Sequence, residues 1–174
     1  MPLHLVLIGT VLLSLLSAPQ LSIAADDEAE LRATVEKFFA ACARKDLNAL
    51  LSLWSEKSPE IASQKQAMQQ LFDAGDLTFT SPAVSRLKVE ADRASLRATL
   101  HLNRVDARTK QRRSQLLVQN FELRQEGAHW KVWHYGSATD DLAALLAAAK
   151  SREETASLLA TERELVTPEL TSAL

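Results

Sequence analysis

The last strand that the sequence predicts is Trp130-Lys131-Val132-Trp133-His134-Tyr135-Gly136, and this strand narrows the possible folds most. It closes a run of alternating strands that follows a block of helices. Strands joined by short turns pair as antiparallel neighbours. We therefore expect an α+β fold in which a curved antiparallel sheet packs against N-terminal helices, with a cavity between the two layers. Alternation along the strand places His134 on the face of Trp130 and Val132, toward that cavity.

The period of the apolar residues predicts the earlier elements. A period of two predicts strands over residues 77–79, 87–91, 94–102 and 116–123, and a sheet of about four strands. A helical period predicts helices over residues 31–42, 47–54 and 61–72. We expect Asp46 to cap the N-terminus of the second helix, and Gly75 to end the third.

The last part of the chain, residues 138–174, predicts a tail of short amphipathic helices. Ser151 with Glu154, and Thr161 with Glu164, have the spacing of capping boxes. The apolar faces of these helices need cover, either from the rest of the chain or from a partner.

Composition favours one domain with its own core, since the 174 residues are 47% apolar and 24% charged. A net charge of −2 argues against a dedicated nucleic-acid-binding protein. The charge is uneven, because residues 81–137 carry a net of +6 while residues 26–80 and 138–174 each carry a net of −4. Cys42 is the only cysteine, so no internal disulfide can form. We expect it to be a buried thiol, with a nucleophile or an intermolecular bridge as the alternatives.

Residues 1–25 have the pattern of an export signal. Leu3 to Leu16 form an apolar run shorter than the roughly 20 residues that span a bilayer. Small residues follow as Ser22-Ile23-Ala24-Ala25, so we expect cleavage after Ala24 or Ala25 and a secreted or periplasmic protein without a stable membrane span. An uncleaved anchor or a wrongly assigned start is the alternative. The chain then divides into a signal peptide at 1–25, an α+β domain at 26–137 and a helical extension at 138–174.

Two segments resemble the nuclear transport factor 2-like superfamily, including its SnoaL-like and ketosteroid isomerase-like branches. They are Val35-Glu36-Lys37-Phe38-Phe39-Ala40-Ala41-Cys42-Ala43-Arg44-Lys45-Asp46-Leu47 and Gly127-Ala128-His129-Trp130-Lys131-Val132-Trp133-His134. The resemblance covers residues 28–137 and implies a cone-shaped, cystatin-like fold with an internal pocket and frequent dimers across the open sheet face. It also implies mixed function, since the superfamily holds isomerases, dehydratases, polyketide cyclases and members that only bind. The residues expected to line the pocket are Phe38, Phe39, Trp54, Phe72, Phe121, Trp130, Val132 and His134.

His134 is the strongest candidate for chemistry, because an imidazole in a cavity can act as an acid or a base near neutral pH. The alternative is a hydrogen-bonded histidine at the end of a strand. Alternation places Trp133 and Tyr135 on the opposite face, as an interface that a dimer partner or the C-terminal helices would cover. Ketosteroid isomerases use a Tyr and two carboxylic acids in the pocket, so a single Tyr that faces away weakens an isomerase assignment.

Five cations lie in or next to the predicted hairpin loop over residues 106–113: Arg104, Arg108, Lys110, Arg112 and Arg113. One interpretation is contact with an anionic partner, such as phospholipid headgroups or acidic polysaccharide. The other is a solvated sheet edge whose charges discourage pairing with another edge. No aromatic residue is interleaved, so stacking on nucleic acid is not expected.

Together these features favour an exported binding module with a pocket for a small apolar ligand or a face for a protein partner, as a monomer or a homodimer. The sequence has no Ser-His-Asp order, glycine-rich phosphate loop or zinc spacing, so we expect no cofactor or metal site. One alternative is a small lyase, isomerase or hydrolase that works through His134. Another is a scaffold module that docks through residues 138–174.

Overall fold

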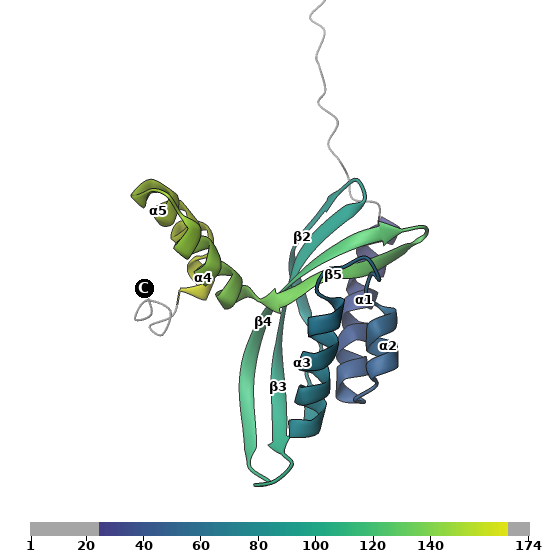
Figure 1. The fold of residues 1–174 in the computed structure, drawn as a ribbon. Coiled ribbons are helices and arrows are strands. Elements are labelled where there is room, and N and C mark those ends of the chain that lie inside the picture. The colour runs from purple at the N-terminus through teal and green to yellow at the C-terminus, as the bar shows by residue number, and fades with distance from the viewer. Residues whose placement is uncertain (1–24, 167–174) are drawn as a thin grey trace, which may run out of the picture.

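The computed structural model describes residues 25–166 and has an α+β architecture (Figure 1), which confirms the predicted fold class. The helices are α1 (Ala25–Ala43), α2 (Leu47–Ser52), α3 (Ile61–Ala74), α4 (Ala138–Ala148) and α5 (Arg152–Thr161), followed by a 3-10 turn, η1 (Arg163–Leu165). The strands are β1 (Gly75–Phe79), β2 (Ala83–Glu90), β3 (Arg93–Asp106), β4 (Arg112–Glu126) and β5 (His129–Ser137).

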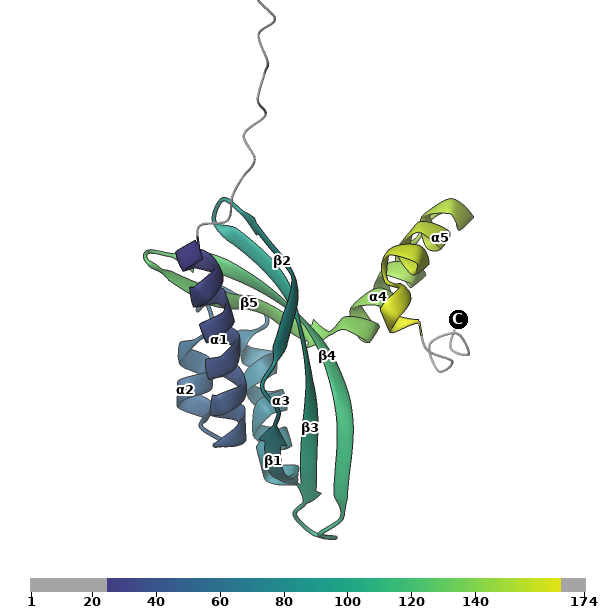
Figure 2. The same cartoon turned by 180° about the vertical axis from the view of Figure 1, so that it is seen from behind.

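The five strands form one antiparallel sheet in the order β1-β3-β4-β5, and β2 also pairs with β3. Along one edge of β3, β1 pairs with residues 102–106 and β2 with residues 93–99. Figures 1 and 2 show α1, α2 and α3 on one side of the sheet and α4 with α5 on the other. We call the first side the inner face and the second side the outer face.

Local sequence signals set several element ends. The Asp46 carboxylate accepts a hydrogen bond from the Ala49 N–H at 2.9 Å, which confirms the predicted N-cap of α2. The Ser151 hydroxyl likewise accepts one from the Glu154 N–H at 3.0 Å at the start of α5. Thr161, by contrast, is the last residue of α5, so the predicted capping box with Glu164 is wrong.

The space between the helices and the inner face is a packed aromatic core rather than an open pocket. The Phe38 ring centroid lies 5.2 Å from that of Phe121 and 4.7 Å from that of Tyr135. Phe121 and Tyr135 are 5.0 Å apart. Beyond the burial of their surface, such ring pairs contribute about 0.5–1.5 kcal/mol each. Seven of the expected pocket residues are buried in this core, namely Phe38, Phe39, Trp54, Phe72, Phe121, Trp130 and Val132.

Trp130 faces the helices, as predicted, and its polar atoms tie β5 to the start of α1. Its indole N–H donates to the Asp27 carboxylate at 3.1 Å, and its backbone N–H donates to the Glu30 carboxylate at 3.2 Å. A buried indole usually finds such a partner. These two bonds fix the first turns of α1 on the last strand.

A β-bulge in β5 changes which side chains face the core. Leu123 of β4 pairs with Val132, and the preceding Glu122 pairs with His134. Trp133 is therefore an extra residue that opposes no partner of its own. A bulge of this kind shifts the alternation of the strand by one residue.

Beyond the bulge, Tyr135 pairs with the inward-facing Phe121, and His134 points to the outer face. The prediction that His134 shares the face of Trp130 and Val132 is therefore wrong. The predicted interface position of Tyr135 is wrong as well, because its ring lies in the aromatic core.

The C-terminal extension packs on the outer face through a second, smaller apolar cluster. Its buried members are Ala138, Leu142, Leu146 and Leu165, and Val118 of β4 packs against them. The Ser137 hydroxyl caps α4 by accepting from the Asp140 N–H at 3.3 Å, so α4 starts directly where β5 ends. Figure 1 shows α4 and α5 projecting from the sheet on this side.

The predicted leader at residues 1–25 lies almost wholly outside the described residues, which begin at Ala25. Between Ala25 and Val166, no helix combines the length and the apolar character needed to cross a bilayer.

Candidate functional site

A cleft of about 640 Å³ lies on the outer face, between the sheet and α4. One wall consists of side chains from β3, β4 and β5, and the other of side chains from α4 and the end of α5. The residues that line it and are used below are Glu60, Arg86, Arg97, Asn120, Glu122, Trp133, His134, Asp141, Leu145 and Glu162. The cleft is absent from the sequence-based expectation, which placed the pocket on the inner face.

His134 lies between two carboxylates in this cleft. Its Nδ1 atom is 2.8 Å from Glu60 Oε1, just before α3, and its Nε2 atom is 3.6 Å from Asp141 Oδ1 on α4. The second oxygen of Glu60, Oε2, is buried and has no hydrogen-bond partner among the described residues. Because a buried carboxylate oxygen without a partner is costly, Glu60 depends on His134 for its stabilisation.

The surroundings of His134 favour its charged form. Burial opposes the charge, but the hydrogen bond with Glu60 and the negative charges of Glu60, Asp141 and Glu122 outweigh it and raise the pKa of His134. With both ring nitrogens facing carboxylates, the imidazolium acts as a positive link between α3 and α4.

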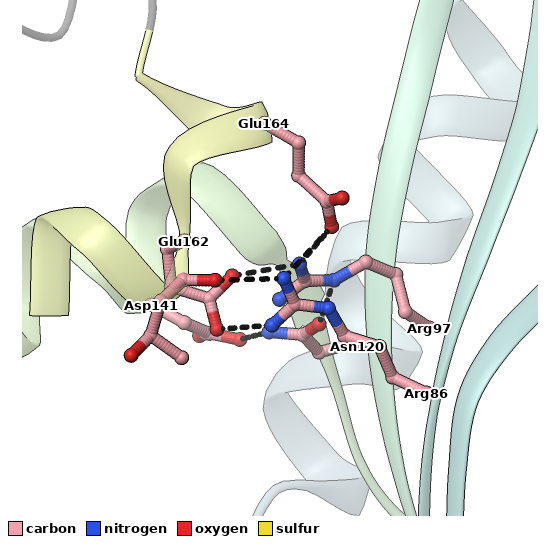
Figure 3. Close-up of polar contacts among 7 residues, drawn as sticks. Arg86, Arg97, Asn120, Asp141, Glu162 and Glu164 are labelled. Atoms are coloured by element: carbon pink, nitrogen blue, oxygen red, sulfur yellow. Dashed lines mark hydrogen bonds and ion pairs between the residues drawn. The ribbon is translucent and has the colours of Figure 1, made fainter.

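A chain of polar contacts continues from Asp141 across the sheet (Figure 3). The Asn120 side-chain amide donates to Asp141 Oδ2 at 2.8 Å, and its oxygen accepts from Arg97 Nε at 3.0 Å. Arg97 then donates to Glu162 and Glu164, each at 2.7 Å. The Arg97 side chain is only 7% exposed, so these charge-assisted bonds compensate the loss of its hydration.

Arg86 reaches the same two glutamates from an unusual backbone conformation. It lies in a bulge of β2 with φ of 52°, a left-handed value that costs a non-glycine residue about 1 kcal/mol or more. Its guanidinium donates to Glu162 at 2.6 Å and to the Thr161 carbonyl at 2.9 Å, and lies 3.2 Å from Glu164. The strained bulge thus aims Arg86 at the end of α5 (Figure 3). We call Arg86, Arg97, Glu162 and Glu164 the arginine–glutamate clamp.

Gly136 gives the histidine and the aspartate room to approach. A Cβ atom at this position would lie 3.0 Å from His134 Nε2 and 3.2 Å from Asp141 Oδ1. Such distances are shorter than ordinary van der Waals contact, so only a glycine leaves this contact undisturbed.

The cleft also has an apolar wall. Trp133 lines it from the sheet, and Leu145 of α4, which is 52% exposed, lines it from the opposite side. The Arg124 guanidinium lies over the Trp133 ring, 4.9 Å from its centroid, in a cation–π contact. Trp133 is therefore on the outer face, where alternation predicted it, although it reaches that face through the bulge.

Most residues of the cleft were not singled out from the sequence. No pattern in the sequence points to Glu60, Asn120, Asp141 or the arginine–glutamate clamp as site residues. One signal was present, because the net +6 of residues 81–137 matches the net −4 of residues 138–174. The clamp joins these two blocks directly.

The five predicted anion-contact residues do gather at one place, the far end of the β3–β4 hairpin. Arg104 of β3 pairs directly with Arg113 of β4, and Arg112 is the first residue of β4. Arg108 and Lys110 lie in the turn, whose Asp106 carboxylate accepts hydrogen bonds from the Arg108 and Thr109 N–H groups. Across residues 25–166, no set of three or more His, Cys, Asp or Glu side chains is placed to hold a metal ion.

Comparison with known proteins identifies a family and a fold. The profile of one family, described as the C-terminal domain of anti-sigma-I factor RsgI9, matches residues 33–140. No curated protein matches the chain significantly.

Solved structures with the same fold are distant in sequence. A conserved protein from Planctomyces limnophilus has a TM-score of 0.58 and 15% identity over 64% of this chain and 94% of its own. A ketosteroid isomerase-like protein from Erwinia carotovora has a TM-score of 0.57 and 14% identity over 64% and 95%. A nuclear transport factor 2-like protein from Salmonella enterica has a TM-score of 0.52 and 13% identity over 63% and 89%. At these identities the likeness shows the fold alone, and it confirms the predicted nuclear transport factor 2-like, cystatin-like fold.

Proposed function

Because the chain belongs to the family of the C-terminal domain of anti-sigma-I factor RsgI9, and because its cleft opens on the outer face of the sheet, we propose that it is an exported binding module. Its ligand is a small organic cation with an apolar body. The observation that carries this proposal is that one cleft of about 640 Å³ holds an aromatic wall beside a carboxylate without an ion pair, that of Glu122.

The charges of the cleft favour a cationic ligand. Four carboxylates line it, those of Glu60, Glu122, Asp141 and Glu162, against two guanidinium groups and one imidazole. Both guanidinium groups are already bound to the glutamates at the end of α5. The Glu122 carboxylate forms no ion pair with any residue in 25–166, so it is the group best placed to receive a positive charge.

The apolar wall accommodates the rest of the ligand. Trp133 and Leu145 line the cleft from different elements, β5 and α4, and give it apolar surface for the body of the ligand. A tryptophan face also attracts a cation within about 6 Å of its centroid. A ligand with an ammonium group next to an aromatic or aliphatic body satisfies both features.

Binding fits this site better than catalysis by His134. A general base needs a free lone pair within reach of the substrate proton. Both nitrogens of His134 face carboxylates, and the raised pKa of His134 favours the protonated ring, which has no free lone pair. The histidine therefore serves to hold the cleft together.

Export is supported by the apolar run from Leu3 to Leu16 and the small residues before Asp26. Expression of the full chain in a bacterial host, followed by intact-mass measurement of the periplasmic fraction, tests this part. Loss of residues 1–24 or 1–25 is the expected result, and an uncleaved cytosolic chain would contradict it.

The ligand class is tested with two matched pairs of probes. Tryptammonium and phenethylammonium are titrated by calorimetry against the neutral tryptophol and 2-phenylethanol. We expect each ammonium probe to bind at least about tenfold more tightly than its neutral counterpart, because only the charged probes use the carboxylates.

Variants then assign the site. Trp133→Ala and Glu122→Gln should each weaken binding of the ammonium probes about tenfold, while Glu56→Gln, an exposed acid outside the cleft, should not. Equal binding of charged and neutral probes, or no effect of Glu122→Gln, would overturn the proposal.

A further inference from the structure

The distal half of β4 has a free edge. β5 pairs with β4 only from Gln119 to Glu126, so the stretch from Arg112 to Val118 has β3 on one side and no strand of the described chain on the other. A free edge presents a row of unpaired backbone N–H and C=O groups that can template another strand.

The alternation of backbone hydrogen bonds along β4 shows which residues present unpaired N–H and C=O groups at the free edge. The Asp106 N–H donates to the Gln111 carbonyl at 2.9 Å, so odd-numbered residues of β4 bond to β3 and even-numbered residues point their backbone groups away from it. At Asn120 and Glu122 the outward groups face β5. At Arg112, Ser114 and Leu116 they have no partner strand in residues 25–166.

The edge of β5 that does not pair with β4 is covered by another part of the chain. The Ser55 N–H donates to the Val132 carbonyl at 2.9 Å, the Ser58 hydroxyl donates to the Trp133 carbonyl at 2.6 Å, and the Gln64 amide donates to the Tyr135 carbonyl at 3.1 Å. The connection from α2 to α3 and the first turn of α3 thus take the place of a further strand. No described segment covers the edge of β4 in this way between Arg112 and Val118.

The free edge ends in an excess of positive charge. Asp106 and Asp76 offset part of the charge of Arg104 and Lys110 from a distance, but none of the five cations forms an ion pair with a carboxylate of residues 25–166. Arg104 lies directly opposite Arg113. Like charges in directly opposed positions destabilise a strand pair. An anionic partner would remove this repulsion.

We infer that the free edge of β4 binds an acidic polypeptide segment in extended conformation, as an added strand. Backbone hydrogen bonds to Arg112, Ser114 and Leu116 give affinity, as in other cases of strand addition. The arginines at the end of the hairpin select carboxylates, and Leu116, which is 54% exposed, offers an apolar contact to a neighbouring side chain.

A second copy of this chain fits the same edge poorly. Antiparallel pairing of two copies would place the cations of each hairpin end opposite the uncharged residues near Val118 of the other copy and leave their charge without a partner. An acidic segment, by contrast, would bring carboxylates to these cations.

The test uses a fluorescein-labelled peptide of eight residues that alternates Glu and Val, titrated with the full chain and followed by fluorescence anisotropy. The first control is the same peptide with N-methylated backbone amides, which keeps the charge but cannot pair as a strand. The second control replaces Glu by Lys. We expect the unmodified peptide to bind at least about tenfold more tightly than either control.

Two variants test the residues. Ser114→Pro removes a backbone donor that points to the free side and leaves the β3 ladder intact, whereas Ser114→Thr keeps the donor. The double variant Arg112→Glu with Arg113→Glu reverses the charge at the end of the edge. We expect Ser114→Pro and the double variant each to weaken binding at least about tenfold, and Ser114→Thr to leave it unchanged.

Other outcomes overturn the inference. Equal binding of the N-methylated peptide would show a purely electrostatic contact. Tighter binding of phosphatidylglycerol vesicles or of alginate than of the peptide, insensitive to Ser114→Pro, would assign the cations to a lipid surface or a polysaccharide. Because the N-methylated control uses the unmodified protein, the test does not depend on a variant that fails to fold.

Discussion

Phe121 is buried among aromatic rings on the inner face of the sheet, whereas one residue later Glu122 opens into a polar cleft on the outer face. The inner face is filled by side chains from α1 and the sheet. The outer face holds charged residues in pairs and leaves a hollow between them. In this chain the inner face supplies stability and the outer face supplies the groups that can recognise a ligand.

The contents of the two faces differ from the prediction of a pocket between the sheet and the N-terminal helices. Pocket residues were expected between the two layers, yet Phe38, Tyr135 and Phe121 occupy that space with centroid distances of 4.7–5.2 Å. The C-terminal extension builds a different hollow on the opposite side. Five experiments test this difference between the two faces.

The largest expected effect is on the free energy of unfolding, when neighbouring residues on the two faces are each replaced by alanine. Phe121→Ala should lower the free energy of unfolding by about 3–5 kcal/mol, because it removes a buried ring and leaves a cavity. Glu122→Ala, the matched control, should change it by less than about 0.5 kcal/mol. Urea denaturation followed by circular dichroism measures both, and similar losses would contradict the division between the faces.

The single tyrosine reports which face it occupies. Burial, with a smaller contribution from Cys42, raises the pKa of Tyr135 well above its ordinary value of about 10. Tyrosinate absorbance should therefore appear in the folded protein only when alkali unfolds it. A control in guanidinium chloride should titrate near pH 10, and the same titration in the folded protein would place the ring on the outer face after all.

Arg97 tests how firmly the extension is held. Arg97→Met should lower the free energy of unfolding by about 2 kcal/mol, less than the roughly 3–5 kcal/mol of a fully buried pair because Glu164 is 55% exposed. Proteolysis near residues 161–166 should accelerate before the rest of the chain is cut. Arg93→Met, an exposed change on the same strand, serves as the control. Unchanged proteolysis would show that the apolar cluster alone docks the extension.

Gly136→Ala should have a smaller effect, a loss of about 1 kcal/mol, since its Cβ would press on His134 and Asp141. The pKa of His134, followed by NMR, should fall toward its ordinary value as Asp141 moves away. In a His134→Ala background the loss should largely disappear, as a double-mutant cycle would show. An undiminished loss would place the strain elsewhere.

The smallest effect is a pH dependence of stability from His134. Its folded pKa lies above the ordinary value of about 6.5, so its contribution is complete below that pH and is lost as the pH rises through the folded pKa. The difference in thermal midpoint between the native chain and His134→Gln should therefore shrink from acidic to alkaline pH. A difference that grows with pH would show that the neutral ring is the stabilising form.

The sequence predicted the elements and their order well, because their signals are local. The Asp46 cap, the Ser151 cap and the helix end at Gly75 all lie where side-chain chemistry placed them. Alternation also placed Trp130 and Val132 in the core correctly. Each of these features depends on residues within one or two turns of each other.

The cleft could not be predicted in the same way. The bulge at Trp133 comes from the pairing of β5 with β4, and no residue type within β5 indicates a bulge at that position. It exchanges the faces of His134 and Tyr135 and so moves the histidine out of the expected pocket. Glu60 meets the ring from 74 residues earlier in the chain. Asp141 comes from α4, which directly follows β5, but it can reach the ring only because the bulge turns His134 to the outer face.

The arginine–glutamate clamp has a mechanical consequence. A pull on the end of η1 would load the side-chain contacts of Glu162 and Glu164 with Arg86 and Arg97, and the apolar contacts of Leu165, before it loaded the backbone hydrogen bonds between the strands. These side-chain contacts would separate at low force while the backbone ladder of the sheet still held. Tension on this end would thus open the cleft without unfolding the domain.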